Sequence, residues 1–214
     1  MEIRPSILAA NREEFARKVE LVRSLGLALH VDVMDGVFVG QSCWAEPLTV
    51  NELADGLRFD AHLMVSQPEH EVPVWLVSDA ERVFFHVEST HRQELILRTV
   101  NDRPRIGLAL NPNTPVSDVA PFFDRISSVL VMTVEPGRSG QPMLPDMLRK
   151  VRTIRGMSPN LHITVDGGVR PDNIAAVADA GADAVVVGSA LTDAPDPTAA
   201  LRALMAAIQL TVTT

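Results

Sequence analysis

Short aliphatic segments alternate with longer amphipathic segments along this chain. Such alternation is typical of repeated βα units, in which helices cover the strands of a parallel sheet. Residues 129–132 and 185–187 are apolar at every position, which indicates strands that are covered on both faces. The pattern predicts eight strands, at residues 3–8, 28–33, 58–64, 82–87, 105–110, 127–134, 161–165 and 184–188.

The longer segments predict helices at residues 13–24, 91–100, 144–155, 171–180 and 197–209. Pro171 and Pro197 suit the first turn of a helix, whereas Pro73 is expected to interrupt the third helix. Eight strands separated by helices predict a closed (β/α)8 TIM barrel, and residues 1–214 are expected to form it as a single domain. A doubly wound open sheet is the alternative, but the first strand is not followed by the Gly-x-Gly-x-x-Gly fingerprint typical of that fold.

Composition restricts the classes of partner. Hydrophobic residues make up 46% of the 214 residues and aromatic residues only 4%, which suits one domain with an aliphatic core. The net charge of −8 argues against nucleic-acid binding and against attraction to an anionic membrane. Cys43 is the only cysteine, so an internal disulfide and a zinc–thiolate cluster are excluded. Without a signal-peptide pattern or a membrane-spanning run, a cytoplasmic location is expected.

Candidate chemistry gathers at the ends of the predicted strands. His30 and Asp32 are two residues apart on one strand, so both side chains project to the same side. His62 and Asp166 stand at the ends of two further strands. Converging imidazole and carboxylate groups can hold a divalent metal, or one can position the other for proton transfer. For any one segment, the alternative is a buried histidine hydrogen-bonded to an aspartate.

Glycine-rich loops follow the last strands. Gly167-Gly168 comes after the seventh strand and Gly188-Ser189 after the eighth, where barrels of this kind often bind phosphate. Each loop could instead be only a tight turn. A third glycine-containing loop, residues 136–142, follows the sixth strand and is a candidate lid.

Seven motifs occur along the chain: Pro5-Ser6-Ile7-Leu8, His30-Val31-Asp32-Val33-Met34-Asp35-Gly36, His62-Leu63-Met64, Leu110-Asn111-Pro112, Met132-Thr133-Val134-Glu135-Pro136-Gly137, Val165-Asp166-Gly167-Gly168 and Val187-Gly188-Ser189. In this order they resemble the ribulose-phosphate 3-epimerases, which are (β/α)8 barrels of the ribulose-phosphate-binding type that invert C3 of a ketopentose phosphate. The resemblance covers nearly the whole chain.

The resemblance implies a metal-dependent epimerase that acts through an enediolate. His30, Asp32, His62 and Asp166 would bind one divalent ion, which would be zinc, iron or manganese, and Asp32 and Asp166 would also transfer the protons. Substrate contacts would come from Ser6, His62, Gly137, Arg138, Ser139, Gly140, Gly167, Gly168, Gly188 and Ser189. Met34, Met64 and Met132 would line the active site. His86 and Glu88 repeat the spacing of a histidine and an acid, but the resemblance assigns them no ligand role and we interpret them as structural.

Departures from the family pattern leave the substrate open. In the lid, Arg138 and Ser139 replace the usual phenylalanine and glycine, and Arg138 could face either the site or solvent. D-Ribulose 5-phosphate, converted to D-xylulose 5-phosphate, is the leading substrate, and another ketose phosphate such as allulose 6-phosphate is the second. A phosphosugar lyase or decarboxylase is disfavoured, because Met34 stands where those enzymes carry a lysine. A non-catalytic sugar-phosphate-binding barrel and a homo-oligomer also remain open.

Overall fold

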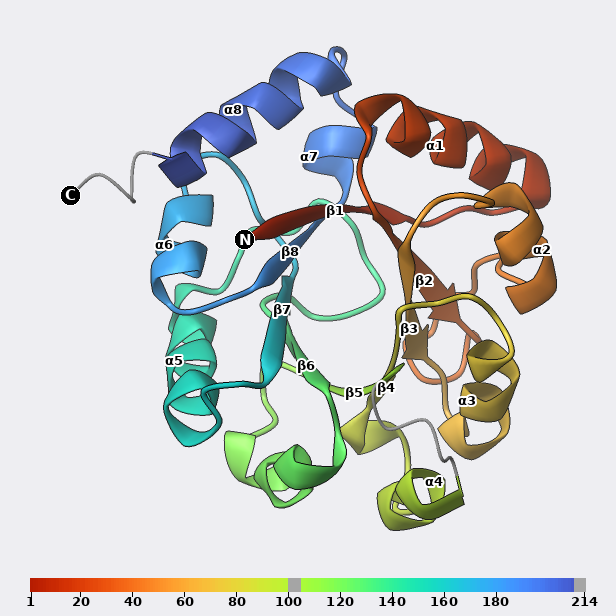
Figure 1. The fold of residues 1–214 in the computed structure, drawn as a ribbon, viewed down its shortest axis with the longest axis vertical. Helices are drawn as coiled ribbons and strands as arrows, with labels where there is room; N and C mark the ends of the chain where they lie inside the picture. The colour runs from red at the N-terminus through yellow and green to blue at the C-terminus, as the bar shows by residue number, and fades with distance from the viewer. Residues whose placement is uncertain (100–104, 210–214) are drawn as a thin grey trace.

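A closed barrel of eight parallel strands forms the centre of the computed structural model, which describes residues 1–99 and 105–209 (Figure 1). The strands are β1 (Glu2–Ile7), β2 (Leu29–Met34), β3 (Phe59–Met64), β4 (Arg82–His86), β5 (Ile106–Leu110), β6 (Ser128–Met132), β7 (His162–Asp166) and β8 (Ala184–Val187). They pair in sequence order, and β8 pairs with β1 to close the ring. The predicted TIM barrel is therefore confirmed, and each predicted strand end lies within two residues of the observed one.

Helices surround this barrel on the outside (Figure 1). They are α1 (Arg12–Leu25), α2 (Pro47–Leu53), α3 (Pro68–Leu76), α4 (Gln93–Thr99), α5 (Leu148–Met157), α6 (Ile174–Asp179), α7 (Ser189–Thr192) and α8 (Pro197–Gln209). Short 3-10 turns are η1 (Val87–Ser89), η3 (Val116–Asp118), η4 (Ala120–Arg125) and η5 (Pro145–Met147). Between β5 and β6, the 3-10 turns η3 and η4 stand in place of a helix. None of the helices in the described ranges has the length and apolarity needed to cross a bilayer.

Helix α1 shows how local sequence sets an element. The side chain of Asn11 accepts a hydrogen bond from the amide of Glu14, which caps the first turn. Phe15, Val19 and Val22 follow at helical spacing and are completely buried against the barrel. Gly26 then ends the helix in the left-handed conformation at φ 68°, which a glycine adopts without steric cost.

Several helix predictions need correction. The predicted helix at 171–180 begins only at Ile174, because the Asn173 side chain accepts from the Arg170 amide and donates to the Gly168 carbonyl, which holds the preceding residues in a turn. Pro73 does not interrupt the third helix, since α3 continues through it.

Helix ends elsewhere also differ from expectation. The helix predicted at 144–155 is divided into η5 and α5, and α2 was not predicted. The helix predicted at 91–100 is observed as α4, and its last predicted residue lies outside the described residues.

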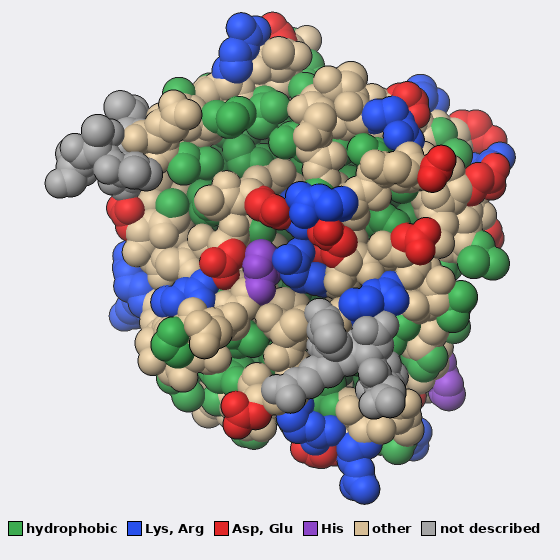
Figure 2. Space-filling model, viewed as in Figure 1, with side chains coloured by type: hydrophobic (Ala, Val, Ile, Leu, Met, Phe, Trp, Pro, Cys, Tyr) green, Lys and Arg blue, Asp and Glu red, His purple; other side chains and the backbone are tan. Residues whose placement is uncertain are grey.

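Charged side chains close the end of the barrel where the strands begin. Arg4 is fully buried and pairs with Asp60 at 3.1 Å, Glu2 at 2.8 Å and Glu81 at 2.7 Å. Burial raises the pKa of Asp60 to about 6, although the nearby charge of Arg4 opposes this rise. Figure 2 shows acidic, basic and histidine side chains together near the middle of one face of the molecule. These ion pairs occupy the interior of the barrel at the end opposite to the one where the strands finish.

Candidate active site and metal centre

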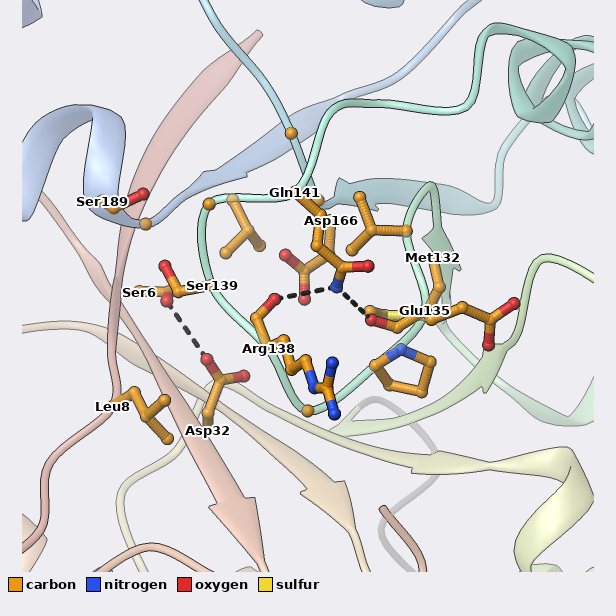
Figure 3. Close-up of a pocket in the computed structure, with 18 of the residues that line it drawn as sticks. Ser6, Leu8, Asp32, Met132, Glu135, Arg138, Ser139, Gln141, Asp166 and Ser189 are labelled. Carbon is orange, nitrogen blue, oxygen red and sulfur yellow. Dashed lines mark hydrogen bonds between the residues drawn. The ribbon is translucent and has the colours of Figure 1, made fainter. Parts of the chain in front are cut away.

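A pocket that is partly open to solvent lies at the carboxyl ends of the strands. Ser6 of β1, Asp32 of β2 and Asp166 of β7 contribute to its wall (Figure 3). The candidate lid, residues 136–142, borders the pocket through residues 136–141, and Gly188 and Ser189 after β8 line its side. This is the end of a TIM barrel where active sites are found.

Four side chains converge beneath this pocket. Strands β2 and β3 pair so that Asp32 lies opposite His62. The Oδ1 atom of Asp32 is 3.1 Å from Nδ1 of His62, and Oδ2 of Asp166 is 3.5 Å from the same nitrogen. Nε2 of His30 is 3.7 Å from Oδ1 of Asp32. One ligand atom from each residue lies within 4.8 Å of all the others, so the four could hold one metal ion.

His30 provides the test of whether a metal fits. Its imidazole is fully buried, yet neither ring nitrogen has a hydrogen-bond partner within the part of the chain that the structure describes. An unpaired buried nitrogen is costly unless it faces a cation or another donor. Two imidazoles and two carboxylates are also donors that suit zinc, iron or manganese. The residues present therefore fit a divalent ion.

Burial and charge set the protonation of this cluster. Burial raises the pKa of Asp166 to about 7, and the negative charge of Asp32 acts in the same direction. Burial raises the pKa of Asp32 too, but its close contact with Nδ1 of His62 and the other nearby histidine outweigh burial, so this pKa lies below its usual value. Burial lowers the pKa of His30 to about 3. A neutral His30 and an ionised Asp32 are the forms that bind a cation.

The structure brings nearly all the predicted substrate-binding residues to the pocket. Its lining includes Ser6, Asp32, Gly137, Arg138, Ser139, Gly140, Asp166, Gly167, Gly168, Gly188 and Ser189. Met34, Met64 and Met132 line it as well. His30 and His62 do not line the open space, because both are completely buried beneath it. Ser6 donates to Oδ2 of Asp32 at 3.1 Å, which helps to orient this carboxylate (Figure 3).

Hydrogen bonds within the lid hold its shape. The Nε2 atom of Gln141 donates to the carbonyls of Glu135 and Arg138 at 2.7 and 3.0 Å (Figure 3). Gly137 adopts φ 94°, and a Cβ there would lie 2.9 Å from Cβ of Val39, so the lid lies directly against the loop that follows β2. Arg138 is exposed, and its guanidinium makes no hydrogen bond or ion pair within the described ranges.

Sequence reasoning did not name every residue at the site. The additional lining residues are Leu8, Val134, Glu135, Pro136, Gln141, Val169, Arg170, Val186 and Ala190. Glu135 and Gln141 belong to or adjoin the predicted lid loop, so the glycine pattern was a usable signal for them. Nothing in the local pattern around Arg170 marks it as a site residue. His86 and Glu88 lie behind His62, and their spacing did draw attention to them.

Solved structures of differently named proteins share this architecture. The fold matches that of a 3-hexulose-6-phosphate synthase with a TM-score of 0.72 and 19% identity, over 97% of this chain and 100% of the other. It also matches KGPDC from Streptococcus mutans with a TM-score of 0.70 and 16% identity, over 98% of each chain. At such low identity these similarities establish the fold alone.

Sequence comparison is more specific. The family model for the ribulose-phosphate 3-epimerase family matches residues 2–192. The ribulose-phosphate 3-epimerase of Schizosaccharomyces pombe is 37% identical over 203 residues, which cover 92% of this chain and 89% of that protein. The enzyme of the same name from Mycobacterium tuberculosis is 38% identical over 213 residues, covering 94% of this chain and 90% of the other. The chain therefore belongs to the ribulose-phosphate 3-epimerase family of isomerases.

Proposed function

We propose that this protein interconverts D-ribulose 5-phosphate and D-xylulose 5-phosphate by proton transfer between Asp32 and Asp166. The main support is that both carboxylates lie close to the same nitrogen, Nδ1 of His62. Asp32 of β2 is 3.1 Å from it and Asp166 of β7 is 3.5 Å from it. Family membership supports the reaction class. Inversion of a carbon requires a base on one face of the planar intermediate and an acid on the other. In this proposal Asp32 and Asp166, on two separate strands, take these two roles.

In this proposal His30, Asp32, His62 and Asp166 hold one divalent ion. When bound, such an ion supplies Lewis-acid stabilisation of the negative charge that develops as the C3 proton leaves. Two imidazoles leave the cluster with no more than two negative charges, from Asp32 and Asp166. The burial of both histidines excludes water from the back of the site.

Other side chains of the pocket orient the Asp32 carboxylate and keep water away from the reacting carbon. Ser6 donates to one oxygen of Asp32 and leaves the other oxygen directed towards the cluster, so this carboxylate has a defined orientation. Met34, Met64 and Met132 are almost fully buried and line the same pocket. Their polarizable side chains exclude water from the reacting carbon, and exclusion of water protects an enediolate from unwanted protonation.

Glycine loops form the other part of the pocket, where the phosphate is proposed to bind. Gly167 and Gly168 have φ values of 116° and 65°. A Cβ on Gly168 would lie 2.3 Å from the amide nitrogen of Met143, so the backbone passes closer than any side chain would allow. Gly188 lies beside the hydroxyls of Ser139 and Ser6, each 3.5 Å from where its Cβ would be. Backbone amides and hydroxyls are the donors that suit an anion such as phosphate.

A lyase that forms a Schiff base is not supported. The chain has two lysines, and Lys18 donates to the carbonyl of Leu8 at 2.7 Å, whereas Lys150 donates to the carbonyl of Asn111 at 2.9 Å. Neither lines the pocket that contains Asp32 and Asp166. A nucleophilic lysine has to reach the substrate carbonyl, and neither ammonium group is placed to do so.

The exposed guanidinium of Arg138 bears on the choice of substrate. It belongs to the pocket lining and is not engaged elsewhere in the described residues. A planar, permanently charged donor suits a phosphate or a hydroxyl-rich chain end. We infer that Arg138 tightens phosphate binding or favours a longer ketose phosphate, such as allulose 6-phosphate. Comparing kcat/KM for both substrates in Arg138→Phe, Ser139→Gly and the double variant tests this, and unchanged ratios in all three would contradict it.

The metal part of the proposal is tested by elemental analysis of the purified protein. We expect about one divalent ion per chain, loss of epimerase activity on exhaustive chelation, and recovery when zinc, iron or manganese is returned. Full activity after the metal has been removed would show that the histidines have another role.

The proton-transfer part is tested with Asp32→Asn and Asp166→Asn. Each variant should lose at least about 100-fold in epimerisation, the usual minimum for a missing acid or base. In deuterium oxide, a variant that retains metal should still exchange the C3 hydrogen of one substrate epimer through its remaining carboxylate. Near-normal turnover in either variant would rule out the two-carboxylate scheme.

A further inference from the structure

A buried histidine lies directly behind His62, and the proposed chemistry does not use it. His86 is the last residue of β4, and its Nε2 is 2.9 Å from Nε2 of His62. Its other nitrogen, Nδ1, is 3.3 Å from Oε2 of Glu88. Both imidazoles are fully buried, and their ring centroids are 5.1 Å apart. A continuous chain of polar atoms therefore runs from Glu88 through His86 and His62 to the carboxylates of the site.

Counting protons along this chain from an ionised Glu88 and a neutral His86 shows which arrangement leaves Nδ1 of His62 free for a metal ion. The Glu88 carboxylate can only accept, so His86 carries its proton on Nδ1. A neutral His86 then has a lone pair on Nε2, and the short contact with His62 requires a proton on the facing nitrogen of His62. A neutral His62 has no second proton, so its Nδ1 is a bare lone pair.

That bare lone pair faces two carboxylates, from Asp32 at 3.1 Å and Asp166 at 3.5 Å. A lone pair surrounded by anionic oxygens is unfavourable in a buried site unless a cation lies among them. We propose that Glu88 and His86 are positioning residues that fix the tautomer of His62, so that its Nδ1 is available to the metal ion. This inference rests on the proposed metal site and assigns a role to two residues outside the four ligands.

Glu88 itself is held firmly enough to act in this way. Its other oxygen, Oε1, accepts from the amide of Asn111 at 2.7 Å. Asn111 belongs to the turn after β5. Lys150 stabilises this turn, because its ammonium group donates to the carbonyls of Asn111 and Thr114 at 2.9 and 2.5 Å. The ring of Phe38 packs against His86 with centroids 4.9 Å apart. Each end of the Glu88 carboxylate therefore has a defined partner.

This geometry makes Glu88→Gln a sharp test. The amide of Asn111 still needs an acceptor, so the glutamine oxygen takes the position of Oε1 and its NH2 faces His86 Nδ1. His86 must then accept at Nδ1 and carry its proton on Nε2. That proton faces Nε2 of His62, which must then accept a hydrogen bond. The proton of His62 therefore moves to its Nδ1, where it prevents this nitrogen from binding the metal. A nearly isosteric change thus reverses the whole chain of hydrogen bonds.

The measurement is the Kd of zinc ion, determined by competition with a chromophoric chelator. We expect zinc binding to weaken 10- to 100-fold in Glu88→Gln and in His86→Phe, the usual effect of losing a hydrogen-bond partner of a metal-bound histidine. Glu94→Gln removes a carboxylate on the neighbouring surface helix α4, where it pairs with Arg125, and should leave the zinc Kd within about twofold.

A spectroscopic readout separates positioning from mere folding. In zinc-loaded protein labelled with 15N at histidine, His62 should carry its proton on Nε2, and this signal should be changed or lost in Glu88→Gln. A Glu88→Gln zinc Kd within twofold of wild type, or a wild-type His62 without a proton on Nε2, would overturn the inference. The proposed function would still stand in either case, because it is tested separately, by metal content, by chelation and by the Asp32→Asn and Asp166→Asn variants.

Discussion

Gly107 of β5 provides the most direct test of packing beneath the metal site. The strand register places it beside Phe84 of β4 and Ser128 of β6, inside the barrel. A Cβ at this position would lie 2.5 Å from Cδ1 of Phe84 and 2.5 Å from Oγ of Ser128. Such separations are far shorter than a carbon contact allows, so Gly107→Ala must displace its neighbours.

The expected cost follows from that displacement. Phe84 is fully buried, and its ring centroid is 6.4 Å from that of His30, so a ligand candidate lies beside it. Adding one methyl group to a filled core typically costs about 1–3 kcal/mol. We expect Gly107→Ala to lower the free energy of unfolding by that amount and to weaken zinc binding as well, because a displaced Phe84 ring would shift the neighbouring His30 ring.

Urea denaturation measures the first effect, and Gly156→Ala is the matched control. Gly156 lies in α5, and a Cβ there would meet nothing within 4 Å. That substitution should raise the free energy of unfolding by roughly 0.5–1 kcal/mol, because alanine favours a helix.

A second comparison combines Gly107→Ala with Phe84→Leu, which removes ring atoms where the methyl would clash. The double variant should be more stable than the sum of the two single changes predicts. Unchanged stability of Gly107→Ala, or strictly additive effects, would refute the reasoning.

Two further predictions concern the opposite end of the barrel. Burial lowers the pKa of His162 to about 4 from an ordinary 6.5, so its contribution to stability is complete above pH 6.5 and declines as the pH falls towards 4. Between pH 7 and pH 5 the wild type should therefore lose up to about 2 kcal/mol more unfolding free energy than His162→Gln, and parallel pH profiles would contradict this. Asp60→Ala leaves Arg4 buried with only its partners Glu2 and Glu81, so urea denaturation should show a loss of about 3 kcal/mol. A loss below about 1 kcal/mol would show that the remaining carboxylates are sufficient.

The elements of the barrel could be predicted because their signals are local. A run such as residues 129–132, apolar at every position, identifies a strand buried on both faces without reference to any other part of the chain. Helix α8 was predicted with the observed ends because Pro197 marks its first turn and its apolar residues recur at helical spacing. Predictions failed where a distant contact decided the outcome, as at Asn173, whose side chain bonds back to Gly168 and delays α6.

The candidate site could also be predicted only in part from the sequence. The two-residue spacing of His30 and Asp32 predicted that both face one side, because side chains alternate along any strand. The positions of His62 and Asp166 at the ends of two further predicted strands marked them as candidates, and the family resemblance added their roles as ligands and, for Asp166, in proton transfer.

Tertiary structure alone decided the distances between these groups. The register of β2 with β3 places Asp32 opposite His62, and closure of the ring brings Asp166 within 3.5 Å of the same imidazole. It also places His86 behind His62 and gives Glu88 a second partner from the turn after β5. A residue's type and neighbours determine which strand it joins and which way it faces. Hydrogen bonds and pKa shifts depend on burial and on separations of a few Å between strands, which only the packed barrel determines.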